Sequence, residues 1–224
     1  MKLALVVIPA YNEDSQIEPL LGQIKEITDI DIVVVNDGST DKTLEVCKNL
    51  NVKCLSHLIN LGYGAAVRTG FAYAKKHPNY KYIVTMDGDG QHTVDQLKLL
   101  LEECKKNQLD LIVGRRVRKE QMPISRKAIN ALADLFFWAL SGKYFVDTQS
   151  GLKAIRLNSL YDLELNSVDY ELCTEILLKY SKKKCKIGWV DIEALYSEYS
   201  LNKPVKQRVI NALSMVINLL KIST

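Results

Sequence analysis

Short apolar runs rich in β-branched residues alternate with segments of helical spacing along the first half of the chain. This alternation restricts the possible folds more than any other feature of the sequence. The apolar runs span residues 3–8, 30–35, 52–55, 82–86 and 109–113. Between them, apolar residues recur three and four positions apart, as on one face of a helix. The pattern predicts an α/β fold with a mostly parallel central sheet and helices on both faces.

The alternation ends after Gly114. Residues 128–140 have helical spacing and large apolar side chains, and residues 204–224 predict a final amphipathic helix. The chain has 224 residues, with no internal repeat and no obvious linker. We therefore expect one main domain, residues 1–203, followed by the C-terminal amphipathic helix.

Charge and cysteine content narrow the class of protein. The net charge of +4 suits anionic small molecules or an acidic lipid surface, but lacks the dense basic patches of a nucleic-acid binder. Five cysteines at wide, unrelated spacings predict reduced thiols and a cytoplasmic location. The apolar run near the N-terminus is too short for a signal peptide, and no stretch reaches the about 18 apolar residues of a membrane span. We expect a soluble or peripheral protein.

The strongest chemical signal is the run Asp87-Gly88-Asp89-Gly90-Gln91, which directly follows a strand. Two carboxylates one residue apart can converge on a hard divalent cation, and Gln91 adds a third oxygen at the same spacing. Mg²⁺ and Mn²⁺ prefer such oxygen ligands, often completed by substrate phosphates. The plain alternative is an acidic turn in which the glycines adopt positive φ.

Two further polar segments follow strands, at the edge where open α/β sheets bind ligands. Pro9, Tyr11 and Glu13 come at the end of the first strand. Tyr11 can stack on a nucleobase, and Glu13 can hydrogen-bond the base or the ribose. Asp37 follows the second strand and can accept hydrogen bonds from the same groups. Each segment is also compatible with an ordinary turn or helix cap.

Gly62 and Gly64 open a predicted helix. Free N–H groups at a helix N-terminus can face a donor phosphate or ribose. A glycine pair by itself is weak evidence. It gains weight because it recurs at the same expected edge of the sheet.

Together these segments resemble family 2 glycosyltransferases with the A-type, Rossmann-like fold. The resemblance is closest to the polyprenyl-phosphate sugar transferases, such as dolichyl-phosphate mannosyltransferase. It covers residues 3 to about 200 and implies a nucleotide-diphosphate sugar, UDP- or GDP-linked, as donor. The matching runs are Val7–Glu13, Asn36–Asp41, Asn60–Ala66, Met86–His92, Gly114–Arg116 and Asp147–Leu152.

The resemblance implies a role for each matching residue. Asp87, Asp89 and Gln91 would hold Mg²⁺ or Mn²⁺ on the donor diphosphate. Arg116 would face the diphosphate or the acceptor, and Arg126 would contact the acceptor. The implied donor-binding set is Pro9, Tyr11, Glu13, Asp37, Gly62, Gly64 and Asp87. Either arginine could instead be a solvated surface cation.

The sequence is compatible with two classes of acceptor. A lipid phosphate is already anionic and needs no general base, whereas a sugar hydroxyl of a glycan needs one. The run that begins at Asp169 resembles the family segment that supplies such a carboxylate, with Glu171 or Asp169 as the candidate. Glu171 and Glu175 also stand one helical turn apart, as on a solvated helix face. The basic residues 115–127 before an apolar helix favour a lipid phosphate such as dolichyl or undecaprenyl phosphate.

Three departures from the family pattern put the acceptor subtype in question. Tyr63 stands where lysine is common, Glu193 stands where relatives have proline, and residues 197–200 lack the usual basic side chain. Two other functions compete with a glycosyltransferase. A nucleotidyltransferase usually carries a basic, glycine-rich phosphate loop early in the chain, which we do not find. A catalytically silent nucleotide-sugar-binding protein would have no need of intact Asp87 and Asp89.

The C-terminal segment predicts a helix with one apolar face. Such a helix can lie in a membrane interface, with Lys203, Lys206 and Arg208 near anionic headgroups. Residues 128–140 could supply a second amphipathic surface. The same apolar face could instead pack on the sheet or on a second copy of the chain, as in a homo-oligomer. The apolar face consists of Val209, Ala212, Leu213, Val216, Ile217 and Leu220.

Overall fold

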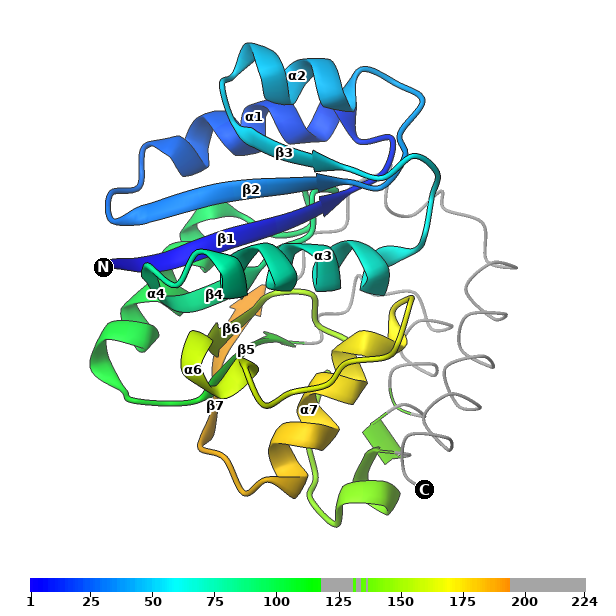
Figure 1. The fold of residues 1–224 in the computed structure, drawn as a ribbon. Helices are drawn as coiled ribbons and strands as arrows, with labels where there is room; N and C mark the ends of the chain where they lie inside the picture. The colour runs from blue at the N-terminus through cyan, green and yellow to red at the C-terminus, as the bar shows by residue number, and fades with distance from the viewer. Residues whose placement is uncertain (118–130, 132–133, 136, 194–224) are drawn as a thin grey trace.

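The computed structural model describes residues 1–117, 131, 134–135 and 137–193, and one seven-stranded sheet organises them (Figure 1). The strands are β1 (Lys2–Ala10), β2 (Ile30–Asn36), β3 (Lys53–Ser56), β4 (Tyr80–Thr85), β5 (Leu111–Val117), β6 (Lys153–Arg156) and β7 (Ile187–Glu193). Their order is β3-β2-β1-β4-β6-β5-β7. Only β6 runs antiparallel to its neighbours, so the predicted mostly parallel sheet is confirmed.

Helices cover both faces of the sheet, as predicted. They are α1 (Asp14–Lys25), α2 (Thr43–Asn49), α3 (Tyr63–Lys76), α4 (Val94–Lys106), α6 (Leu157–Leu160) and α7 (Glu171–Lys182). Because side chains alternate along a strand, β1 faces two separate cores. Val6 and Ile8 pack with α1 and α4, whereas Leu5 and Val7 pack with α3, α6 and α7. Figure 1 shows α3 lying across the front of the sheet.

The strand β6 lies in the stretch where the sequence pattern predicted no sheet. It has four residues, and its first, Lys153, is a buried lysine that breaks the apolar pattern. Because β6 is antiparallel to β4, Lys153 pairs with Thr85, the last residue of β4. The Thr85 hydroxyl donates to the Gly151 carbonyl (2.7 Å). The loop before β6 is therefore brought to the carboxyl end of β4.

Part of the predicted apolar helix at residues 128–140 belongs to the core. Phe137 is fully buried and meets Phe145 edge-to-face, with ring centroids 5.3 Å apart. Trp138 is half exposed. The side chain of Phe137 is therefore not available to a membrane surface.

Two predictions lie outside the described residues: the acceptor contact of Arg126 and the amphipathic helix of residues 204–224. Among the residues that the structure describes, no helix is long and apolar enough to cross a membrane.

Candidate active site

The carboxyl ends of β1, β2 and β4 bring the predicted polar segments to one edge of the sheet. The Asp37 N–H donates to the Ala10 carbonyl (2.9 Å), and the Met86 N–H donates to the Val7 carbonyl (3.1 Å). Pro9 lies within β1, one residue before its end. The arrowheads of β1, β2 and β3 point to the same side in Figure 1. The segments after β1, β2 and β4 thus form a common edge, as the sequence predicted.

The carboxylate pair Asp87 and Asp89 stands directly after β4. Burial, and then the negative charge of Asp89, raises the pKa of Asp87. Oxygen Oδ1 of Asp87 is buried and has no hydrogen-bond partner. Asp89 accepts hydrogen bonds from the Gln91 backbone N–H (3.1 Å) and from the Gln91 side-chain amide (2.6 Å). Gln91 therefore orients Asp89, and its own role as a metal ligand stays a prediction.

This arrangement fits a divalent cation. Within the described ranges, no three His, Cys, Asp or Glu side chains form a complete metal cage. Mg²⁺ and similar ions are commonly held by one or two carboxylates and completed by substrate phosphates. Two carboxylates that repel each other, one with an unsatisfied buried oxygen, provide such a partial ligand set.

Asp37 anchors the loop that leads to α3. Its carboxylate accepts from the N–H groups of Leu61 and Gly62 (both 2.9 Å) and lies 2.6 Å from His57 Nδ1. His57 Nε2 in turn contacts the Thr69 hydroxyl (2.9 Å). A carboxylate with three partners retains little capacity for a base or ribose. His57 was not among the residues predicted from the sequence, although it directly follows the strand β3.

Gly62, just before α3, does not offer its N–H group to a donor phosphate. Gly62, at φ +97°, donates to Asp37, and the Ala65 N–H donates to the Val168 carbonyl (3.0 Å). A β-carbon at Gly64 would approach the carbonyl oxygens of Ser167 and Asp169 to within 2.8 Å. The glycines instead permit close contact between α3 and the segment before α7.

The segment after β1 is fixed against the segment after β2. Asn12 has a φ of +54°, its N–H donates to the Ser39 hydroxyl (3.0 Å), and its side-chain oxygen accepts from the Thr40 N–H (2.8 Å). Tyr11 is 45% exposed, whereas Glu13 is buried. The exposed ring of Tyr11 is thus presented at the sheet edge, consistent with its predicted contact to a nucleobase.

Arg116, at the end of β5, is held by Asp147. Its guanidinium Nε and Nη2 donate to the two carboxylate oxygens at 2.9 and 2.6 Å, and its backbone N–H adds a third bond at 2.8 Å. Asp134 fixes the Asp147 loop by accepting from the N–H groups of Asp147 (3.2 Å) and Thr148 (3.1 Å). Arg116 is therefore largely buried and preorganised, so a freely solvated cation is excluded.

The carboxylates at the start of α7 are buried. Glu171 and Glu175 are both under 4% exposed, so the solvated helix face is wrong. Glu175 accepts from the N–H groups of Asn166 (3.1 Å) and Ser167 (2.9 Å) and pairs with Lys179 (2.9 Å). Burial alone would raise the pKa of Glu175, but these contacts lower it. Glu175 is thus a structural residue, which leaves Glu171 and Asp169 as candidates for chemistry.

Four residues near Asp87 were not identified from the sequence as parts of a site. A β-carbon at Gly151 would overlap both carboxylate oxygens of Asp87. Tyr63 stacks on Tyr170, with ring centroids 4.8 Å apart and ring planes 9° apart. The buried Lys153 ammonium donates to the Ser150 carbonyl. The contacts of Gly151 with Asp87 and of Tyr63 with Tyr170 join residues far apart in the chain, so no local sequence pattern predicts them.

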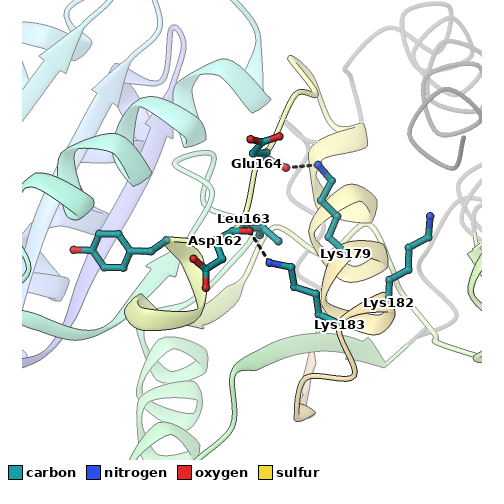
Figure 2. A pocket seen from close by; sticks show the side chains of 7 residues that line it. Asp162, Leu163, Glu164, Lys179, Lys182 and Lys183 are labelled. Carbon is teal, nitrogen blue, oxygen red and sulfur yellow. Dashed lines mark hydrogen bonds between the residues drawn. The ribbon is translucent and has the colours of Figure 1, made fainter.

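A surface pocket of about 410 Å³ lies elsewhere, between the 161–164 segment and the second half of α7 (Figure 2). Lys182 is about 16 Å along the helix axis from Glu171. Lys183 donates to the Asp162 carbonyl (2.6 Å) and Lys179 donates to the Glu164 carbonyl. Two of the three lysines that line the pocket are thus bound to backbone oxygens. Its lining is Tyr161, Asp162, Leu163, Glu164, Lys179, Lys182 and Lys183.

The sequence is similar to known sugar transferases. It is 31% identical over 223 residues to the UDP-N-acetylglucosamine–dolichyl-phosphate N-acetylglucosaminyltransferase of Methanococcus voltae, covering 89% of this chain and 88% of the relative. It is also 31% identical over 175 residues to the undecaprenyl-phosphate mannosyltransferase of Micrococcus luteus, covering 74% and 71% of the two chains.

The fold is similar to solved A-type glycosyltransferases. Glucosyl-3-phosphoglycerate synthase from Mycobacterium tuberculosis, crystallised with Mn²⁺, UDP-glucose and phosphoglyceric acid, superposes with a TM-score of 0.81. The match covers 99% of this chain and 80% of that one, at 19% identity. The family model for glycosyl transferase family 2 matches residues 5–159. The chain therefore belongs to glycosyl transferase family 2 and is a nucleotide-sugar glycosyltransferase.

Proposed function

We propose that this enzyme transfers the sugar of a UDP- or GDP-linked donor to a polyprenyl phosphate, dolichyl or undecaprenyl phosphate, with Mg²⁺ or Mn²⁺ as cofactor. The carboxylate pair after β4 carries the proposal, because Asp87 Oδ1 is buried without a protein partner. Two relatives about 31% identical over most of the chain have names that specify dolichyl-phosphate or undecaprenyl-phosphate acceptors. The M. tuberculosis enzyme of the same fold was crystallised with Mn²⁺ and UDP-glucose.

The residues at the sheet edge divide into distinct roles. Asp87 and Asp89 hold the cation, which when bound acts as a Lewis acid on the leaving diphosphate. Tyr11 stacks on the base, and Pro9 and Glu13 shape the nucleoside pocket around it. Arg116, fixed by its buried partner, adds positive charge where the diphosphate departs. The donor-binding set also includes Asp37, Gly62 and Gly64, which act through the loop that they order.

A sugar hydroxyl is the second candidate acceptor, favoured by the carboxylates before and within α7. Burial, and then the negative charge of Glu171, raises the pKa of Asp169. A raised carboxylate pKa is typical of a general base near neutral pH. With a lipid phosphate as acceptor, Glu171→Gln should change turnover little, and Arg126→Ala should weaken acceptor use more than donor binding. With a sugar hydroxyl, Glu171→Gln should collapse the rate.

Contact with the cytoplasmic face of a membrane is part of the proposal, because a polyprenyl phosphate is a lipid. The apolar face predicted within residues 204–224 and the nearby cations supply the surface. Liposome flotation with anionic vesicles at low salt compares the full chain with a version that ends at Asn202. If both stay in the soluble fraction, the membrane contact is wrong, and the apolar face packs on the protein or on a second copy.

The direct test is turnover with a panel of nucleotide sugars, each offered polyprenyl phosphate or a glycan, with Mn²⁺ or with excess chelator. We expect transfer to polyprenyl phosphate that stops when the metal is removed. Transfer only to a glycan hydroxyl would establish the second candidate. Donor binding without transfer or hydrolysis would instead identify a catalytically silent binding protein.

A further inference from the structure

Two tyrosines from distant parts of the chain form one stacked unit beside the carboxylate pair. Tyr63 is the first residue of α3, and Tyr170 immediately precedes α7. Their rings lie 4.8 Å apart and almost parallel. The close approach depends on Gly64, whose missing side chain lets α3 contact the backbone of residues 167–169. The stack is therefore built by the tertiary fold and held by backbone contacts.

The two rings have different surroundings. Tyr63 is partly buried, and its hydroxyl lies 4.0 Å from Cys173 Sγ. Burial, and then the charge of Asp87, raises the pKa of Tyr63. Tyr170 is 47% exposed, although one of its faces is covered by Tyr63. Tyr170 thus retains exposed aromatic surface, while the ring of Tyr63 covers one of its faces.

The loop that places Gly151 against Asp87 also contacts α7, the helix that begins just after Tyr170. After desolvation, the charges of Asp87 and Asp89 are the largest influences that raise the pKa of Tyr170. A donor whose diphosphate is held at these carboxylates has its sugar one bond beyond the phosphate. The sugar ring of such a donor would lie close to the cation, and therefore near the carboxylates whose charges act on Tyr170.

We propose that the Tyr63–Tyr170 stack is the subsite for the pyranose ring of the donor sugar. Tyr170 contacts the C–H-bearing face of the ring, and Tyr63 is a positioning residue that holds Tyr170 by stacking on it. An aromatic face suits this ligand because it packs on apolar C–H groups while the sugar hydroxyls remain available for polar contacts. This inference rests on the proposed function, because it requires a nucleotide-sugar donor at Asp87 and Asp89.

Calorimetry with Mn²⁺ separates the sugar contact from the nucleotide contact. The wild type, Tyr170→Ala, Tyr170→Leu and Tyr170→Phe are each titrated with the nucleoside diphosphate and with the nucleotide sugar that the wild type binds best. We expect Tyr170→Ala and Tyr170→Leu to weaken nucleotide-sugar binding about tenfold. Nucleoside-diphosphate binding should change less than about twofold, and Tyr170→Phe should behave as wild type.

Tyr161 provides the matched control, since it is 46% exposed and lies in the distant pocket of Figure 2. Tyr161→Ala should leave both affinities unchanged. The proposed subsite is wrong if Tyr170→Leu binds the nucleotide sugar with the affinity of the wild type. It is also wrong if the affinities for the nucleotide sugar and the nucleoside diphosphate fall by the same factor. If the wild type binds nucleoside diphosphate but no nucleotide sugar, or neither ligand, the proposed function fails and the subsite fails with it.

Discussion

Arg116 and Asp147 form a bidentate ion pair, in which Nε and Nη2 of the arginine donate to the two carboxylate oxygens. The Asp147 side chain is only 2% exposed. The pair joins the end of β5 to the loop before β6, which also carries Gly151 against Asp87. An arginine predicted to face a diphosphate thus has a second, structural task. Its charge is held in a fixed position before any substrate arrives.

Replacing Arg116 should destabilise the fold as well as the reaction. Arg116→Ala leaves the Asp147 charge buried and uncompensated, which costs about 3–5 kcal/mol of unfolding free energy. Arg116→Lys should recover only part of this loss, because lysine keeps the positive charge but its ammonium group cannot make both hydrogen bonds. Urea unfolding measures the effect. Arg115→Ala is the neighbouring control, since its exposed pair with Asp191 should contribute less than about 1 kcal/mol.

The same ion pair predicts a dependence of stability on pH. Burial alone would raise the pKa of Asp147, but the charge and hydrogen bonds of Arg116 outweigh burial and lower it. A lowered carboxylate pKa contributes stability above the unfolded-state value of about 3.9, and that contribution is lost as the pH falls through the folded-state pKa. The difference in unfolding free energy between wild type and Asp147→Asn should therefore be constant near neutral pH.

Below about pH 4 that difference should shrink. Urea unfolding at a series of pH values measures it, with Asp95→Asn as the control because the Asp95 side chain is 88% exposed. A difference that grows on acidification would contradict the assignment.

Asp89→Ala should abolish transfer and leave the fold intact. Asp89 holds the proposed cation with Asp87, so its loss should lower turnover at least about a hundredfold. Circular dichroism should be unchanged, because the side chain follows β4 and lies outside the apolar cores. Turnover like that of the wild type, or full activity in excess chelator, would refute the metal role.

Gly151→Ala should disturb the site without replacing any charged residue. The new methyl group would overlap both oxygens of Asp87, so the carboxylate must move. Displacement by about 1 Å can cost a hundredfold in rate. Gly22→Ala is the matched control, because a β-carbon there has no neighbour within 4 Å and Gly22 lies inside α1. It should stabilise the protein by about 0.5–1 kcal/mol and leave turnover unchanged. Equal turnover in the two variants would show that the Asp87 position is not critical.

The order of apolar and polar segments was enough to predict the fold class and the sheet edge where the candidate site lies. Strands such as β1 and β4 are local apolar runs, and the residues that follow them are adjacent in the chain. Since parallel strands end at one edge of the sheet, the positions of Tyr11, Asp37 and Asp87 followed from order alone. The short strand β6 was not predicted, because its register depends on pairing with β4 and β5. Its buried lysine also interrupts the apolar pattern that would mark a strand.

The partners of these polar groups depend on the tertiary structure. Asp37 accepts hydrogen bonds from N–H groups 24 and 25 residues away, and Arg116 donates to a carboxylate 31 residues away. Tyr63 and Tyr170 meet through a backbone contact between α3 and the segment before α7. Hydrogen bonds and ring stacks depend on distance in space, and packing sets that distance for residues remote in sequence. Residue type therefore indicated these side chains as candidates for the site, but their partners could be identified only from the fold.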